Sequence, residues 1–237
     1  MKRFYCGLWI LSLVLVCQAQ AQVHKYSLQI SVEKTHSVNY LVYLPKGYST
    51  TPSNRWPVLL YLHGGSLRGD DLTLVTRQGL PYQLEHGFGI PFIVVAPQCP
   101  AGEIWTDTDG LKAMLDEVAR TYRVDEHRVY ATGHSMGGRG VWYLAYTYPD
   151  YFAAIIPIAG LSTIQHWATR LGQLPVWAFH GETDAIAPLS DSQALVATLE
   201  KAGGKAKLTI LPKRDHFVLD LYEQKELYDW LLTHRKP

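Results

Sequence analysis

The fold is decided by the stretch RVYATGHSMGGRGVWYLAYT, residues 128–147. Its first part, 128–132, is an apolar run that predicts a buried strand, and 141–147 has helical spacing. Between them lies G-H-S-M-G, a G-x-S-x-G motif centred on Ser135. In this context the motif is typical of a sharp strand-to-helix turn that holds the serine in a strained conformation, with glycines where a side chain would collide with backbone. We predict that Ser135 is a nucleophile; the alternative is a glycine-rich structural turn.

A serine hydroxyl is a weak nucleophile and needs a base that a third group holds in place. Of the chain's ten histidines, only His216 follows the last predicted strand, on the loop before the closing helix. Because the carboxyl ends of parallel strands meet at one edge of a sheet, His216 should lie near Ser135. We therefore predict His216 as the general base. The alternatives are a surface position for His216 and, within the pocket, His166 as its rival.

The acid is expected on the loop after the strand predicted over 175–179, because this architecture orders the residues as serine, acid, histidine. Two carboxylates lie there, Glu182 and Asp184, in the segment H-G-E-T-D. A carboxylate at this place can reach the histidine ring and fix its tautomer. We prefer Asp184 to Glu182, since H-G-x-x-D is the usual arrangement after such a strand.

The oxyanion of an acyl-transfer reaction needs preorganised N–H donors, which are usually backbone amides. The segment L-H-G-G-S, residues 62–66, follows the first predicted parallel strand, where this architecture places one donor. The predicted donors are the amides of Gly65 and Met136, the second being the residue after the nucleophile; Ser66 is the alternative to Gly65. A glycine-rich phosphate cradle is the competing interpretation, but neither Lys-Ser/Thr nor G-x-G-x-x-G follows.

The rest of the chain alternates strand and helix, which predicts an α/β fold with a mostly parallel twisted sheet and helices on both faces. No stretch between the strands is long enough for a separate lid domain, so 22–237 should form one domain. The predicted strands are an opening antiparallel pair over 26–32 and 38–44, then 57–62, 91–96, 128–132, 152–158, 175–179 and 207–211. The predicted helices lie around 111–119 and over 141–147, 192–202 and 222–233.

The first residues, 1–21, predict a signal peptide that is cleaved near Ala21. Two basic residues precede an apolar run over 8–16, and a small-x-small A-Q-A pattern closes the segment. The run is too short to span a bilayer, so we expect a secreted or periplasmic protein without stable membrane insertion. The alternatives are an N-terminal core helix and a lipoprotein signal with Cys17 as the lipidated residue.

The composition is that of a globular protein, with 47% apolar residues and 28 aromatic residues among 237. A formal charge of +1 gives no reason to expect nucleic acid or an anionic membrane as partner. Three cysteines are too few for a disulfide framework, and only Cys99 would remain after cleavage. Histidines 63, 134, 180 and 216 lie on different loops without H-x-x-x-H spacing, so we expect neither a metal site nor another cofactor.

Nearly the whole chain after residue 21 resembles secreted α/β-hydrolases of the esterase and "predicted peptidase" type. These are relatives of dienelactone hydrolases, polyhydroxybutyrate depolymerases and feruloyl or acetylxylan esterases. The resemblance is carried by residues 62–65, 96–100 with Trp105, 132–138, 148–149, 152–154, 179–181 with Asp184, and 226–231.

The resemblance implies the α/β-hydrolase fold, a triad of Ser135, Asp184 and His216, and Trp105 as an aromatic wall near the acyl or alcohol site. Two departures stand out in this sequence. Members of the family often have glycine just before the catalytic histidine, where this chain has Asp215. Dienelactone hydrolases use a cysteine nucleophile, whereas this chain has serine, so that activity is disfavoured.

Together these features predict a secreted serine carboxylic-ester hydrolase that works through an acyl-enzyme on short-chain or carbohydrate-linked esters, such as acetyl or feruloyl esters. Besides Trp105, we expect His134 and Trp167 to contact the substrate, the last within the loop 161–174. The alternatives are a serine peptidase with the same triad and a non-catalytic carbohydrate-binding descendant of the fold. The expected partner is a small-molecule or polysaccharide-linked ester; the oligomeric state is not predicted.

Overall fold

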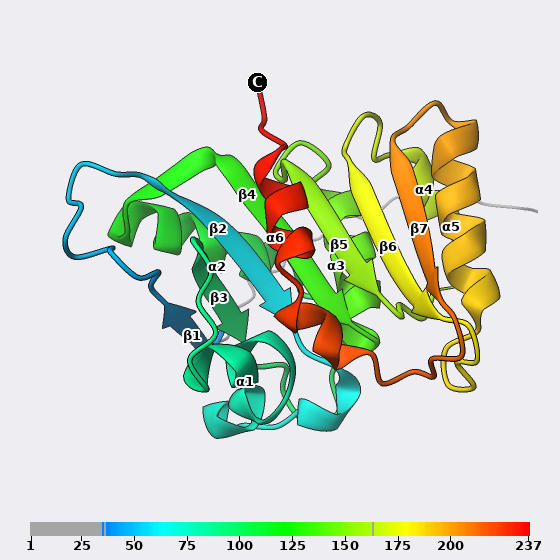
Figure 1. The fold of residues 1–237 in the computed structure, drawn as a ribbon, viewed down its shortest axis with the longest axis horizontal. Helices are drawn as coiled ribbons and strands as arrows, with labels where there is room; N and C mark the ends of the chain where they lie inside the picture. The colour runs from blue at the N-terminus through cyan, green and yellow to red at the C-terminus, as the bar shows by residue number, and fades with distance from the viewer. Residues whose placement is uncertain (1–34, 36, 163) are drawn as a thin grey trace, which may run out of the picture. The chain divides into compact units, whose positions relative to one another are not determined.

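The computed structural model describes residues 35, 37–162 and 164–237, and within them seven strands form one sheet (Figure 1). The strand order is β1-β3-β2-β4-β5-β6-β7. β1 runs antiparallel to β3, and the other neighbouring strands are parallel. The strands are β1 (Tyr40–Tyr43), β2 (Trp56–Leu62), β3 (Ile93–Pro97), β4 (Val124–His134), β5 (Ala154–Ile158), β6 (Val176–Gly181) and β7 (Ala206–Leu211).

Helices connect the parallel strands, so the predicted α/β alternation is confirmed. The predicted strand over 38–44 forms β1, but β1 pairs with β3; its expected partner over 26–32 lies outside the described residues. The α-helices are α1 (Gly79–Glu85), α2 (Thr108–Thr121), α3 (Met136–Thr147), α4 (His166–Thr169), α5 (Leu189–Lys201) and α6 (Lys225–Leu232). The 3-10 turns are η1 (Gly65–Leu67), η2 (Leu72–Arg77) and η3 (Leu219–Glu223).

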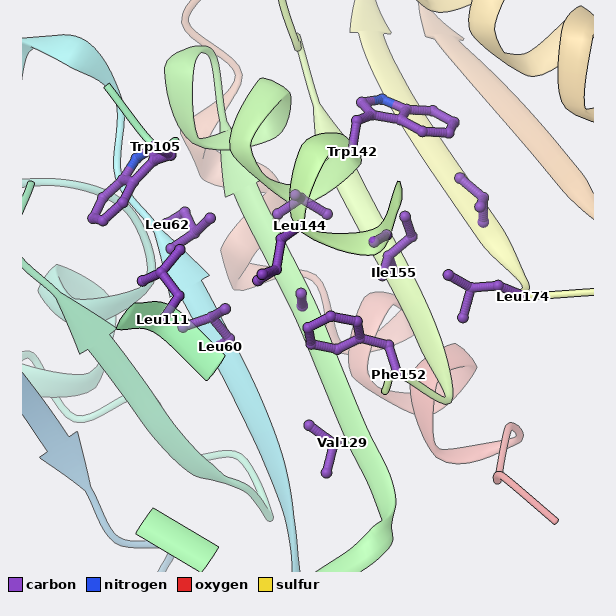
Figure 2. Packing of buried hydrophobic residues seen from close by; sticks show 14 of the residues in the cluster. Leu60, Leu62, Trp105, Leu111, Val129, Trp142, Leu144, Phe152, Ile155 and Leu174 are labelled. Carbon is purple, nitrogen blue, oxygen red and sulfur yellow. The ribbon is translucent and has the colours of Figure 1, made fainter. Parts of the chain in front are cut away.

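Two hydrophobic clusters cover the two faces of the sheet, as predicted for helices on both faces. One cluster joins the sheet to α2, α3 and α5, and the other joins it to α1 and α6 (Figure 1). In the first, Leu60 and Leu62 of β2 meet Leu111 of α2 and Leu144 of α3 (Figure 2). β2, β3 and β5 are buried almost throughout, which explains why their sequences are continuous apolar runs rather than alternating ones.

The prediction of one closing helix over 222–233 is wrong. The segment divides at Gln224, whose backbone is extended, into η3 and α6. Tyr222 and Leu227 are both buried, yet they are five residues apart, a spacing that a continuous helix of 3.6 residues per turn would place on different faces. The break lets both side chains reach the same core.

Residues Ser37–Pro237 form one compact unit. The predicted signal peptide over 1–21, with the alternatives for Cys17, lies outside the described residues and stays a prediction, as does a domain that begins at residue 22. No helix in the described part of the chain has the length and apolar character needed to cross a bilayer.

The parallel strands deliver the predicted site residues to one edge of the sheet. Leu62 at the end of β2 is in register with Gly133 of β4, and His134 is in register with Ile158 at the end of β5. Gly181 at the end of β6 is in register with Leu211 of β7. The loops that leave these strands therefore start side by side, although up to about 150 residues separate them in the sequence.

Candidate active site

Ser135 occupies a strained turn between β4 and α3. Its φ of 58° and ψ of −117° are rare for a residue with a side chain. Its amide donates to the carbonyl of Ile158 at 2.9 Å, which anchors the turn on β5. A Cβ at Gly137 would lie 1.8 Å from the carbonyl oxygen of Leu62. The motif thus needs glycine here because neighbouring backbone leaves no room for a side chain, as the sequence predicted.

His216 lies against Ser135. Its Nε2 atom is 2.8 Å from Ser135 Oγ, and its Nδ1 atom is 2.7 Å from Asp184 Oδ2. His216 is 4% exposed, so the ring is held largely out of water. The three residues predicted as a triad are therefore brought together, in the hydrogen-bonding order that the prediction requires. His166, the alternative base, instead begins the short helix α4.

Asp184 is held by several donors at once. Besides His216, the amides of Ile186 and Ala187 donate to its Oδ1 at 2.9 and 2.8 Å. Burial alone would raise the pKa of Asp184, but the hydrogen bonds from Ala187, His216 and Ile186 outweigh it and lower that pKa. Glu182, the other candidate, accepts from the amide of Lys213 at 2.8 Å instead. The structure thus places Asp184 at the histidine ring and Glu182 at the neighbouring loop.

His180 is a contact of the acid that sequence reasoning missed. Its ring is fully buried, and its Nε2 atom lies 3.2 Å from Asp184 Oδ2 and 2.9 Å from the carbonyl oxygen of Ala187. Its Nδ1 atom is 2.7 Å from Ser192 Oγ on α5. The histidine of H-G-x-x-D therefore ties the acid loop to β6 and α5, and the motif itself was the signal that could have revealed this contact.

His134 lies against the loop that carries His216 and is not among the residues that line the cavity described below. Its Nε2 atom donates to the carbonyl oxygen of His216 at 2.7 Å, and the two rings are 4.8 Å apart. Burial lowers the pKa of His134 to about 4, so the ring is neutral at neutral pH. Its predicted contact with substrate is not seen in the lining of the cavity described below; the side chain fixes the backbone at His216 instead.

The glycine segment after β2 lies alongside the nucleophile turn. A Cβ at Gly64 would lie 3.7 Å from Ser135 Cβ, and one at Gly65 would lie 3.9 Å from Met136 Sδ. Gly65 begins η1 and Met136 begins α3, and the first amides of a helix have no acceptor within it. The two amides predicted to hold the oxyanion therefore both belong to helix starts beside Ser135.

His63 and Trp105 hold this glycine segment in place. His63 Nδ1 donates to the carbonyl oxygen of Gly64 at 2.8 Å, while Nε2 accepts the amide of Cys99 at 3.1 Å. Burial lowers the pKa of His63 to about 4, which keeps the ring neutral and able to accept. The indole Nε1 of Trp105 donates to the carbonyl oxygen of His63 at 2.9 Å. Trp105 therefore supports the glycine segment through His63, and it also lines the cavity described below.

A cavity of about 260 Å³ adjoins the nucleophile turn. Two predicted substrate contacts, Trp105 and Trp167, line it, so the structure brings them together although 62 positions separate them. Trp167 comes from α4, a short helix within the segment 161–174 that was expected to be a loop. The other lining residues include Thr106, Met136, Arg139 and Tyr143. Among the described residues, no group of three or more His, Cys, Asp or Glu side chains is placed to hold a metal ion.

The sequence matches the family Esterase, described as "Putative esterase", over residues 31–229. The chain belongs to this family. It is 27% identical over 140 residues to acetylxylan esterase A of Emericella nidulans, covering 53% of this chain and 43% of the relative. It is 27% identical over 178 residues to a poly(3-hydroxyoctanoate) depolymerase of Pseudomonas fluorescens, covering 59% of this chain and 60% of that enzyme.

A solved structure, titled as a thermostable esterase, superposes with a TM-score of 0.70 at 28% identity. The match covers 84% of this chain and 59% of the other. The fold is therefore that of the α/β-hydrolases, as predicted. The esterase family spans most of the chain, whereas the chain spans less than two thirds of the length of the curated relatives that it matches.

Proposed function

We propose that the protein is a serine carboxylic-ester hydrolase in which Ser135 is the nucleophile, His216 the general base and Asp184 the acid that orients it. The observation that carries the proposal is the continuous chain of contacts from Ser135 Oγ to His216 Nε2, and from His216 Nδ1 to Asp184 Oδ2, at 2.8 and 2.7 Å. Membership of the esterase family supports the reaction class.

In the first half-reaction, Ser135 Oγ attacks the ester carbonyl while His216 Nε2 takes the serine proton. This requires the proton of the neutral ring to sit on Nδ1, where Asp184 accepts it. The lowered pKa of Asp184 keeps it ionised at neutral pH, so it stabilises the imidazolium that forms. The amides of Gly65 and Met136 receive the oxyanion, and His216 then protonates the leaving alcohol.

In the second half-reaction, water attacks the acyl-enzyme. His216 takes a proton from the water, a second tetrahedral intermediate forms on the same amides, and its collapse returns the proton to Ser135 Oγ. The acid product then leaves. Apart from the ester and the water, both steps use only the side chains and backbone amides named above.

The substrates that this site supports best are short-chain or carbohydrate-linked esters, such as acetyl or feruloyl esters. The esterase family and the acetylxylan esterase relative support this class. Four of the exposed large apolar side chains lie on the loops of the site: Ile104, Ile164, Ile186 and Phe217. Exposed apolar side chains on these loops favour contact with an acyl or aromatic group. Secretion or export to the periplasm is part of the same proposal and rests on residues 1–21.

The test is hydrolysis of 4-nitrophenyl acetate by the wild type and by Ser135→Ala. We expect Ser135→Ala to lower kcat by at least about 10⁴-fold with no loss of fold, because no other group takes the acyl chain. Ser53→Ala, on the exposed loop before β2, is the matched control and should keep full activity. Equal rates for wild type and Ser135→Ala would refute the proposal.

The peptidase alternative is tested with a single acyl group that is carried once as an ester and once as an amide. The ethyl ester and the 4-nitroanilide of N-acetylphenylalanine share their acyl part; a serine peptidase hydrolyses both linkages, whereas an esterase should hydrolyse the ester and leave the anilide intact. Turnover of the anilide that Ser135→Ala abolishes would replace the esterase assignment with a peptidase. Acetylated xylan and methyl ferulate then rank the natural ester types.

A further inference from the structure

Arg139 lies one helical turn beyond the proposed nucleophile. Its amide donates to the carbonyl oxygen of Ser135 at 3.0 Å, and residues four apart on a helix share a face. The side chain is half-buried, and its guanidinium carbon lies 5.6 Å from the ring centre of Trp167. Among the described residues, no carboxylate forms an ion pair with it. Arg139 is thus a cation beside the site without a counter-charge from this part of the chain.

The cavity beside Arg139 has aromatic walls. Trp105, Tyr143 and Trp167 line it, and its lining contains neither aspartate nor glutamate. Its volume of about 260 Å³ exceeds the roughly 150 Å³ of a cavity that holds benzene, so one substituted aromatic ring fits. Met136, which directly follows Ser135 in the chain, also lines the cavity, so the cavity borders the turn that carries the proposed nucleophile.

The chemistry of the Arg139 guanidinium favours a carboxylate. The group lies within cation–π distance of the indole of Trp167, and its plane carries a fork of N–H donors. A carboxylate accepts two parallel hydrogen bonds from this fork. It also supplies the negative charge that the lining lacks.

We propose that this cavity binds a planar aromatic ring that carries a carboxylate, and that Arg139 selects for that carboxylate. The inference rests on the proposed esterase function and names a further substrate class for the same site. The members of this class are aromatic esters with a carboxylate on the ring, whether the ring belongs to the acid or to the alcohol. Neutral acetyl and feruloyl esters would use the site without this ion pair.

Two pairs of matched esters test the proposal. Methyl 4-carboxybenzoate and methyl 4-methylbenzoate differ only in the charge on the acid ring, and 4-carboxyphenyl acetate and 4-methylphenyl acetate differ likewise on the alcohol ring. Arg139→Met removes the charge and keeps most of the length. We expect it to lower kcat/KM for the carboxylate member of at least one pair about 10- to 100-fold. The neutral member of that pair should change less than about threefold, as for the loss of a non-essential contact.

Comparison of the two members cancels their intrinsic reactivity, and a second arginine provides the control. Arg170 is exposed and lies over the ring of Tyr146 at 4.9 Å, outside the lining of the cavity. Arg170→Met should leave the ratio between carboxylate and neutral esters unchanged. Arg139→Lys keeps the charge but loses the fork, so it should restore only part of the preference. Circular dichroism and urea unfolding establish that each variant is folded.

A binding measurement makes the result independent of turnover. In Ser135→Ala protein, calorimetry should detect methyl 4-carboxybenzoate or 4-carboxyphenyl acetate, and adding Arg139→Met should weaken that binding about tenfold or more. Equal loss for both members of each pair, or an unchanged ratio, would overturn the assignment of Arg139. If the wild type hydrolysed none of these esters and no 4-nitrophenyl acetate, the esterase function itself would fail, while the binding experiment would still decide the role of Arg139.

Discussion

A cavity at the carboxyl ends of the strands (the carboxyl edge) and a groove at their amino ends (the amino edge) differ greatly in volume. At the carboxyl edge, the cavity beside Ser135 has about 260 Å³. At the amino edge, a groove of about 680 Å³ runs between the starts of β5 and β6 and the end of the chain. Two basic side chains of this groove already have partners: Arg235 contacts Asp125 at 2.8 Å, and Lys236 donates to the carbonyl of Tyr151 at 2.8 Å. The larger of the two is therefore not the one that borders the proposed triad.

At the carboxyl edge, the backbone segments around the proposed triad touch one another directly. A Cβ at Gly133 would lie 2.6 Å from the backbone of Gly137, and one at Gly181 would lie 2.1 Å from the carbonyl oxygen of Asp215. At the amino edge the contacts are mixed: a Cβ on Gly172 would meet nothing within 4 Å, whereas one on Gly204 would lie 2.7 Å from the carbonyl oxygen of Gly172. The turn that carries Ser135 and the loop that carries His216 are thus each fixed by contact with neighbouring backbone. This rigidity is what an acyl-transfer site needs, since its donors must be in place before charge develops.

The largest effect should come from the acid at the carboxyl edge. Asp184→Asn keeps the shape of the side chain but cannot stabilise the imidazolium or fix the tautomer of His216. We expect kcat for 4-nitrophenyl acetate to fall about 10⁴-fold. Glu182→Gln, two residues earlier and bound to the amide of Lys213, should stay within about threefold of the wild type. If Glu182→Gln lost more activity than Asp184→Asn, the acid would have been assigned to the wrong residue.

A smaller but still large difference is expected between one glycine at each edge. Gly137→Ala places a methyl group against the carbonyl of Leu62, so we expect the free energy of unfolding to fall by more than about 3 kcal/mol. Gly172→Ala meets open space and pays only for its positive φ of 55°, about 1 kcal/mol. Urea unfolding of both proteins gives the two values. Similar losses would show that the edges are equally tight.

A smaller effect is expected in the pH dependence of the free energy of unfolding, to which buried histidines at the carboxyl edge contribute. Burial lowers the pKa of His63 and His134 from 6.5 to about 4. Between pH 6.5 and 4 the unfolded chain binds these protons and the folded chain does not, so the free energy of unfolding must fall as the pH falls through this window. The fall is at most roughly 3 kcal/mol for each histidine.

The measurement is urea unfolding at a series of pH values from 7 to 4. His134→Gln removes one of the two rings whose pKa burial lowers and should make the dependence shallower. His127→Gln is the control, because His127 is exposed at the amino edge, and it should leave the slope as in the wild type. A steeper dependence in His134→Gln would contradict the neutral state inferred for that ring.

The sequence could predict the strands and the residues that meet at their carboxyl ends. Buried parallel strands appear as apolar runs, and the position of Ser135, Asp184 and His216 after three such runs is enough to place them at one edge. The contacts behind these residues could not be predicted. Which buried ring faces which carbonyl, as for His134 at His216 and His180 at Ala187, depends on side-chain packing that no periodic pattern records.

Other features were missed because they depend on short-range geometry or on pairing between distant segments. The closing segment has the composition of a helix, but burial of both Tyr222 and Leu227 required a break at Gln224. The four-residue helix α4 is too short to show a period. Arg139 lies between the G-x-S-x-G motif and the helix predicted over 141–147, and no sequence pattern gives it a role; only the position of Trp167 beside it marks it as part of a cavity.

Labelling of the Cys99 thiol can measure how often the protein opens around the glycine segment. Its amide is held by His63, its side chain is 1% exposed, and burial raises the pKa of its thiol to about 11. A thiol reagent at neutral pH therefore cannot reach a reactive thiolate in the closed protein. With Cys6 and Cys17 replaced by serine, the rate at which Cys99 is labelled would report openings around the glycine segment that carries Gly65, one of the two proposed oxyanion donors, without substrate and without turnover.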